Sequence, residues 1–158
     1  MKPEPVDLRI DREGRWFAGG REVIHEKIFR LFCDSLVLEE DGYHIRIDHM
    51  ENPVAVEDAP ISVRSVFVEN TAEGNDIIWT VLSDGRRLPL DPATLRAPAA
   101  DAVYCGVDDG RGFEARFSRF ALQQLGTLLE EGDDPDSFHL HLNGGTFEIK
   151  VGAPGGTP

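Results

Sequence analysis

Two adjacent carboxylates, Glu57 and Asp58, are the residues whose type and position most directly suggest chemistry. They follow an alternating segment, 52–56, and come just before Pro60. Adjacent acids at the end of a strand can bind a cation, accept hydrogen bonds from a ligand or hold an arginine. Alternatively, Asp58 closes a turn by accepting hydrogen bonds from nearby backbone N–H groups. We therefore expect these two residues either in a ligand-binding site or in an ordinary turn.

Trp16 and Arg46 complete the predicted ligand-binding set. The large amphipathic ring of Trp16 either walls a pocket or packs in the core. Arg46 lies on the polar face of the alternating segment 43–48 and could pair with Glu57 or Asp58 if the hairpin is tight. As an exposed ion pair this contact would contribute only about 0.2–1 kcal/mol, and a solvated Arg46 is the alternative.

Histidine pairs are the candidates for a metal site. His139 and His141 project from one face of a predicted strand, and His44 occupies the corresponding place in an earlier one. Such a pair can chelate zinc or nickel, but a site needs further ligands and groups that orient them. None is identifiable, and Phe29 stands where a metalloprotease motif beginning at His25 needs its second histidine. We therefore predict no metal and no cofactor.

Sequence motifs of the common enzyme classes are absent. There is no Gly-rich phosphate loop, no dinucleotide-binding fingerprint and no Gly-x-Ser-x-Gly elbow. Cys33 and Cys105 fit no metal-ligand or redox spacing, so we expect two buried free thiols. We favour a non-enzymatic protein. The alternative is a small hydrolase or isomerase that uses Glu57 and Asp58 as acid/base groups or metal ligands, assisted by His44 or His49.

Two helical patterns and two hairpins must position these residues. Apolar residues recur at helical spacing from Ile24 to Leu36 and again from Phe117 to Leu129, which predicts two helices, the first largely buried. A Gly-containing turn precedes each helix, and an alternating hairpin follows it. Gly42 and Gly132 are predicted to end the helices, with Glu39-Glu40 and Glu130-Glu131 near their C-termini.

The sequence predicts an α+β fold made of two repeated β-β-α-β-β units with a central β-meander and mainly antiparallel sheets. The meander comprises segments 61–67, 77–82 and 86–90, and we expect it to extend the sheet of the first unit. The predicted organisation is an N-terminal lobe (1–90), a linker (91–101), a C-terminal lobe (102–151) and a disordered tail (152–158).

The composition indicates one acidic globular protein. The chain has 158 residues, and 16 Lys+Arg against 29 Asp+Glu give 16 − 29 = −13. This charge makes nucleic acids and anionic membranes improbable partners, because binding them requires basic patches. The start of the sequence lacks the apolar core of a signal peptide, and no apolar run approaches the ~20 residues of a membrane span. We expect a cytoplasmic protein.

Several motifs resemble a known bacterial family. They are Gly14-Arg15-Trp16-Phe17, Ile28-Phe29-Arg30-Leu31-Phe32, Phe113-Glu114-Ala115 and, most specifically, Val56-Glu57-Asp58-Ala59-Pro60. With these motifs the chain resembles the family called domain of unknown function 1285 (DUF1285), roughly from Leu8 to Glu131. The resemblance implies an α+β fold with repeated units, no established enzymatic activity and a role in signalling. It brings no known catalytic residues.

These observations together predict a binding module with a regulatory role. We expect it to recognise a small molecule or a protein partner between its two repeated lobes, because clefts at lobe boundaries are common ligand sites.

Overall fold

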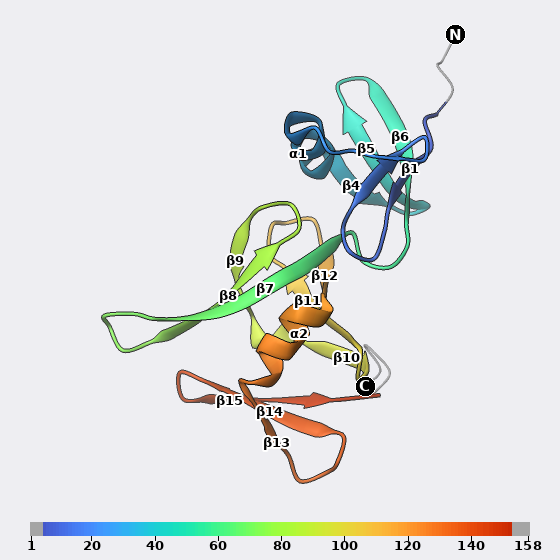
Figure 1. The fold of residues 1–158 in the computed structure, drawn as a ribbon. Coiled ribbons are helices and arrows are strands. Elements are labelled where there is room, and N and C mark those ends of the chain that lie inside the picture. The colour runs from blue at the N-terminus through green and yellow to red at the C-terminus, as the bar shows by residue number, and fades with distance from the viewer. Residues whose placement is uncertain (1–4, 153–158) are drawn as a thin grey trace.

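Three sheets and two short helices make up the fold in the computed structural model, which describes residues 5–152 (Figure 1). The first sheet comes from the N-terminal third and has the strand order β3-β2-β1-β6-β5-β4. Its elements are β1 (Leu8–Ile10), β2 (Trp16–Ala18), β3 (Arg21–Glu22), α1 (Glu26–Ser35), β4 (Leu36–Glu39), β5 (Gly42–Ile47) and β6 (Met50–Val56). Strand β1 runs parallel to β6, whereas the other pairs are antiparallel.

The second sheet has the order β10-β11-β12-β7-β8-β9. Its elements are β7 (Ile61–Asn70), β8 (Asp76–Leu82), β9 (Arg87–Pro89), the 3-10 helix η1 (Pro92–Thr94), β10 (Arg96–Ala99), β11 (Ala102–Val107), β12 (Phe113–Phe117) and α2 (Arg119–Gly126). Only the β12–β7 pair is parallel. The third sheet contains β13 (Leu129–Glu131), β14 (Ser137–Leu142) and β15 (Gly145–Lys150). The α+β class predicted from the sequence is therefore confirmed.

Local patterns predicted the hairpins and turns correctly. The two alternating segments became the β5–β6 and β14–β15 hairpins. Asp48 and Asn143, at the tips of these hairpins, have φ of 53° and 51°, a conformation that Asp and Asn tolerate better than most residues. Gly14 and Gly110 have φ of +80° and +84° in the turns β1–β2 and β11–β12.

Both predicted helices were too long at their C-terminal ends. Leu36 begins strand β4 and Leu129 begins strand β13. The expectation that the glutamate pairs lie near helix C-termini is therefore wrong. Glu39 of β4 pairs with Gly42 of β5, and Glu130 of β13 pairs with His139 of β14. Apolar residues at these positions fit a strand as well as a helix, and pairing with β5 or β14 decides between them.

Helix α1 is much less buried than predicted. None of its residues is fully buried, and the Ile28 and Leu31 side chains are 44% and 46% exposed. One face of the helix, with Phe29 and Phe32, packs against the core, and the opposite face points away from the sheet.

The meander strands β7–β9 share a sheet with strands from the C-terminal half of the chain. Strand β7 pairs with β12, so β7–β9 extend the sheet of β11 and β12, and the expectation that they extend the first sheet is wrong. The segment 91–101, expected as a linker, carries η1 and β10. Strands β4–β6 share a sheet with β1 and β2, whereas β13–β15 form a sheet separate from β11 and β12. The repeated unit therefore stays a prediction.

Apolar residues of all three sheets form one buried cluster, from Leu8 and Trp16 to Val63, Phe113 and Ile149. In the part of the chain that the structure describes, no helix is long and apolar enough to cross a membrane. Of the predicted tail, residues 153–158 lie outside the described residues.

Candidate functional site

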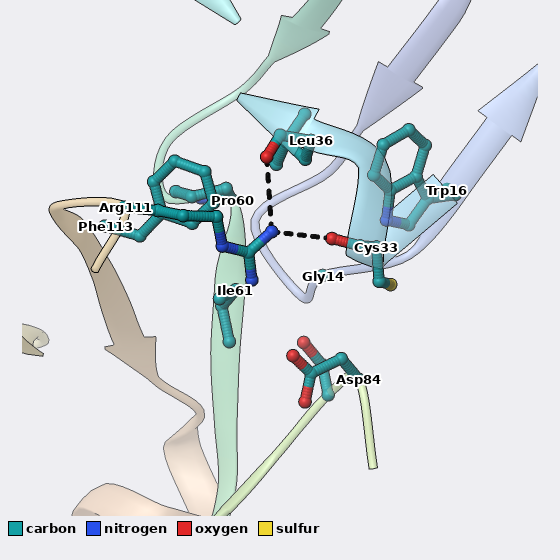
Figure 2. Close-up of a pocket in the computed structure, with 10 residues that line it drawn as sticks. Gly14, Trp16, Cys33, Leu36, Pro60, Ile61, Asp84, Arg111 and Phe113 are labelled. Carbon is teal, nitrogen blue, oxygen red and sulfur yellow. Dashed lines mark hydrogen bonds between the residues drawn. The ribbon is translucent and has the colours of Figure 1, made fainter. Parts of the chain in front are cut away.

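Residues of the first and second sheets face one another at the boundary between the sheets, where Arg111 reaches the end of α1 (Figure 2). Residues from both sides line a cavity there: Gly14, Trp16, Cys33, Leu36, Pro60, Ile61, Ser83, Asp84, Arg111 and Phe113. Its volume is about 10 Å³, which is room for about one water molecule. The boundary between these two sheets therefore has no room for an organic ligand.

Arg111 reaches across the boundary from the second sheet. It lies in the β11–β12 turn, and its Nη1 donates hydrogen bonds to the carbonyl oxygens of Cys33 at 2.7 Å and Leu36 at 3.2 Å (Figure 2). The last carbonyl groups of an α-helix have no partner within the helix. Arg111, which comes from the second sheet, thus donates hydrogen bonds to carbonyl groups at the C-terminal end of α1 and joins the two sheets.

A carboxylate in the same turn holds Arg111 in place. Asp109 accepts hydrogen bonds from the backbone N–H of Arg111 at 3.1 Å, from its Nε at 3.0 Å and from its Nη2 at 2.7 Å. Burial, the largest influence, raises the pKa of Asp109, but hydrogen bonds from Arg111 and Arg86 outweigh it and the net pKa is lowered. Asp109 is therefore an anion that orients the guanidinium group.

A second Asp-Gly-Arg turn interlocks with the first. In the β8–β9 turn, Asp84 accepts hydrogen bonds from the backbone N–H of Arg86 at 3.0 Å and from its Nε at 2.8 Å. Arg86 Nη1 then reaches Asp109 at 3.0 Å. This pair of turns was not predicted from the sequence. The recurrence of Asp84-Gly85-Arg86 at Asp109-Gly110-Arg111 was the signal that could have revealed it.

Trp16 lines the boundary cavity but belongs to the core. Its side chain is buried, and its ring centroid lies 5.4 Å from that of Phe32 in α1. Burial raises the pKa of the nearby Cys33 thiol to about 12. Of the two readings of Trp16 from the sequence, the structure favours packing, because protein atoms fill the space beside it.

Asp58 lies in the segment between β6 and β7, which connects the first two sheets, and it bonds to residues of the second sheet. Its carboxylate accepts hydrogen bonds from the Tyr104 hydroxyl at 2.9 and 2.8 Å and from Arg116 Nη1 at 2.6 Å. Burial raises the pKa of Asp58, but the hydrogen bonds from Arg116 and Tyr104 outweigh it, so the net pKa is lowered. Of the roles considered for this carboxylate, the structure shows the one in which it holds an arginine, Arg116, from the other predicted lobe.

Glu57 points to a different partner. Its carboxylate accepts a hydrogen bond from the backbone N–H of Arg12 at 2.9 Å and one from Arg12 Nε at 3.3 Å, which fixes the β1–β2 turn. Neither Glu57 nor Asp58 lines any of the four cavities described here. The two carboxylates do not converge, so this geometry gives the enzymatic alternative no support.

Arg46 pairs with neither of these acids. It forms an ion pair with Glu39 on β4 and a second, at 3.6 Å, with Glu51 on β6. The expected contact with Glu57 or Asp58 is wrong, because the strand register places Arg46 opposite Glu51. The four predicted site residues therefore have different partners and do not form a common site.

The histidines lie next to acidic side chains, and His44 Nδ1 lies 3.6 Å from Glu51. His44 Nε2 lies 2.9 Å from Asp41, and His141 Nε2 lies 3.0 Å from Glu130. Within residues 5–152, no group of three or more His, Cys, Asp or Glu side chains is arranged to hold a metal ion.

An open cleft lies next to the boundary, on the second sheet. We call it the β9–β11 cleft, and its volume is about 670 Å³. It is lined by Leu88, Pro89, Leu90, Asp91, Thr94, Gly106, Val107, Asp108, Gly112, Phe113 and Glu114. Leu90, Val107 and Phe113 are buried side chains at its base, whereas Asp91 and Asp108 are exposed. An apolar base with a few polar groups around it is the usual composition of a ligand site.

Comparisons with known proteins bear on the fold. No protein-family model and no curated protein sequence matches the chain. Two crystal structures are similar. A DUF1285 family protein from Silicibacter pomeroyi DSS-3 matches with a TM-score of 0.73 and 24% identity, over 95% of this chain and 84% of that one. A DUF1285 family protein from Shewanella baltica OS155 matches with a TM-score of 0.61 and 21% identity, over 76% of this chain and 90% of that one. The resemblance inferred from sequence motifs thus holds at the level of structure, and the fold of this chain is the fold of these DUF1285 family proteins.

Proposed function

We propose that this protein is a binding module with a regulatory role, and that its ligand site is the β9–β11 cleft. The observation that carries the proposal is the cleft itself, whose volume of about 670 Å³ lies within the ~300–1,000 Å³ typical of ligand pockets. The boundary cavity of about 10 Å³ is far below that range. The lining of the cleft comes from residues 88–94 and 106–114, which lie on both sides of the lobe boundary expected from the sequence, and this supports a ligand site between the predicted lobes.

Two other cavities fit the proposal less well. One of about 200 Å³ lies on the first sheet beside Phe32, below the usual volume range. Another of about 400 Å³ lies between α2 and the third sheet, with Glu131 as its only charged lining residue. The β9–β11 cleft combines a sufficient volume with several polar groups, which give a site its specificity.

The regulatory part of the proposal rests on the connection between the cleft and the boundary. Asp108 and Gly112 line the cleft, and they flank the turn in which Asp109 holds Arg111. Arg111 in turn bonds to the end of α1. A ligand that repositions this turn would change the contact between the two sheets. The expected place of action, the bacterial cytoplasm, rests on the sequence alone.

A thermal-shift screen of small organic compounds and peptides tests the proposal. A ligand specific to the folded state at a hundredfold excess over Kd should stabilise the protein by about 2.7 kcal/mol. Leu88→Trp in the β9 wall of the cleft and Asp108→Trp at its rim should abolish the shift. Val68→Trp is the control, because Val68 is exposed and lies outside the cleft. A panel without any shift, or a shift that survives both cleft variants, would refute the proposed site.

A further inference from the structure

An unpaired strand edge borders the β9–β11 cleft. Strand β9 is the last in the order of its sheet and, within residues 5–152, pairs only with β8. The hydrogen bonds from Leu82 N to Arg86 O (2.8 Å) and from Leu90 N to Ile78 O (2.7 Å) lie on either side of the Thr80–Leu88 pair. Because backbone groups alternate in direction along an antiparallel strand, those of Arg87 and Pro89 point away from β8. This edge therefore offers the Arg87 N–H and two carbonyl groups.

On the opposite side of the cleft, the backbone of β11 already has a side chain as its hydrogen-bond partner. Strand β10 pairs with β11 as far as Arg96 and Tyr104. Beyond that point the Gly106 N–H donates to Thr94 Oγ1 at 2.9 Å. A Cβ on Gly106 would lie 3.2 Å from Thr94, so the contact is close. The β11 side therefore needs no further strand, and β9 is the side at which an extended chain could add.

The residues that line the cleft carry negative charge, whereas Arg87 of β9 lies outside the lining, over the Phe67 ring. None of the lining residues is Lys or Arg, and the chain as a whole has a charge of −13. Glu114 is engaged by Arg96 through bonds of 3.1 and 2.8 Å. Asp91 accepts one backbone hydrogen bond, from Ala93 N at 3.1 Å, and is otherwise exposed to solvent, as is Asp108. These two carboxylates are complementary to a cationic ligand.

We propose that the cleft binds an extended, positively charged peptide segment of a partner protein, which adds to the free edge of β9. The inference rests on the proposed function and specifies its ligand. Strand addition gives affinity through main-chain hydrogen bonds and specificity through alternate side chains. Lysine or arginine side chains face Asp91 and Asp108, and the apolar side chains between them enter the space above Val107 and Phe113. Pro89 lacks an N–H, which limits the pairing to a short segment.

Fluorescence anisotropy with a labelled peptide of alternating lysine and valine tests the charge. The double variant Asp91→Asn/Asp108→Asn should bind it roughly three- to thirtyfold more weakly, because each exposed ion pair contributes little. Asn at position 91 can still accept the Ala93 hydrogen bond, so η1 keeps its cap. Asp133→Asn/Asp134→Asn is the matched control. It removes the same charge from an exposed turn outside the cleft and should leave binding within about twofold.

The same peptide, N-methylated at alternate residues, tests the strand pairing. Methylation of the residues that face β9 should abolish binding, whereas methylation of the intervening residues should be tolerated. Equal binding of both methylated peptides, equal binding of a glutamate–valine peptide, or displacement by spermidine as effective as that by the peptide would each overturn the inference. If a small compound stabilises the wild type but not Leu88→Trp while no peptide binds, only the inference fails. If nothing binds, the proposed function fails as well.

Discussion

The guanidinium group of Arg111 donates a hydrogen bond of 2.7 Å to the carbonyl oxygen of Cys33, although the two residues are 78 positions apart in the sequence. Arg111 comes from a turn of the second sheet, and Cys33 from the last turn of α1 beside the first sheet. This contact makes the boundary between the sheets polar and specific. It also places the boundary next to the proposed ligand cleft, because Gly112 and Phe113 line that cleft.

Replacement of Arg111 should weaken the junction of the sheets. We expect Arg111→Ala to lower the free energy of unfolding by about 2–3 kcal/mol, because it leaves helix-end carbonyls without a partner and Asp109 with one cation fewer. Arg111→Lys should recover only part of the loss, since an ammonium group lacks the planar fork. Urea unfolding measures both. Arg64→Ala, at an exposed position on β7, should change stability by less than about 0.5 kcal/mol. An Arg111→Ala protein as stable as this control would contradict the role of Arg111.

Asp58 should stabilise the fold in a pH-dependent way. Its pKa in the folded protein is lowered below the ordinary value of 3.8, so its contribution is present above that value and is lost as the pH falls through the lower, folded pKa. Asp58→Asn should therefore cost about 1–3 kcal/mol at pH 7 and less at pH 3, because the loss begins below pH 3.8. Chemical denaturation of both proteins at the two pH values gives the difference. A cost that stays constant between them would show that the ionised carboxylate is not what matters.

Gly14 should be intolerant of a side chain for two separate reasons. Its φ is +80°, and an added Cβ would overlap Ser83 Oγ and lie 2.7 Å from Ser83 Cβ. Gly20 has a similar φ of +85° but nothing within 4 Å of an added Cβ. We expect Gly20→Ala to cost about 1–2 kcal/mol from backbone strain alone and Gly14→Ala to cost clearly more. Equal losses in thermal or urea unfolding would mean that the close approach of the β1–β2 turn to Ser83 is not significant.

The two thiols should be inert in the folded protein and distinguishable from each other. Burial raises the pKa of Cys33 and of Cys105 from 9.0 to about 12, which lowers the thiolate fraction at pH 8 roughly a thousandfold. Both should therefore react with a disulfide reagent only after denaturation. Arg111→Ala should speed the reaction of Cys33 but not that of Cys105, because only Cys33 lies at the boundary. Cys33→Ser and Cys105→Ser assign the rates, and rapid reaction of both native thiols would contradict this prediction.

The features that the sequence could predict are those that depend on neighbouring residues. Strict alternation of apolar and polar residues predicted β5, β14 and β15, and Gly14 and Gly110 marked the turns, because strand periodicity and positive φ are local properties. The boundary between α1 and β4 was not predictable in this way. Leu36 and Val37 continue the helical spacing, and pairing with Ile45 and His44 makes them a strand.

The sequence by itself thus determined the fold class, the hairpins and turns, the acidic charge and the absence of the common catalytic motifs. Only the tertiary structure decided that β1 pairs with β6 and β7 with β12, and which residues accompany Glu57, Asp58 and Arg46. It also decided that Arg111 bonds to the end of α1 across the boundary between the sheets. The physical reason is distance along the chain. Asp58 and Arg116 are 58 residues apart, and which partner satisfies a buried or half-buried charge depends on how the sheets pack, which no local pattern encodes.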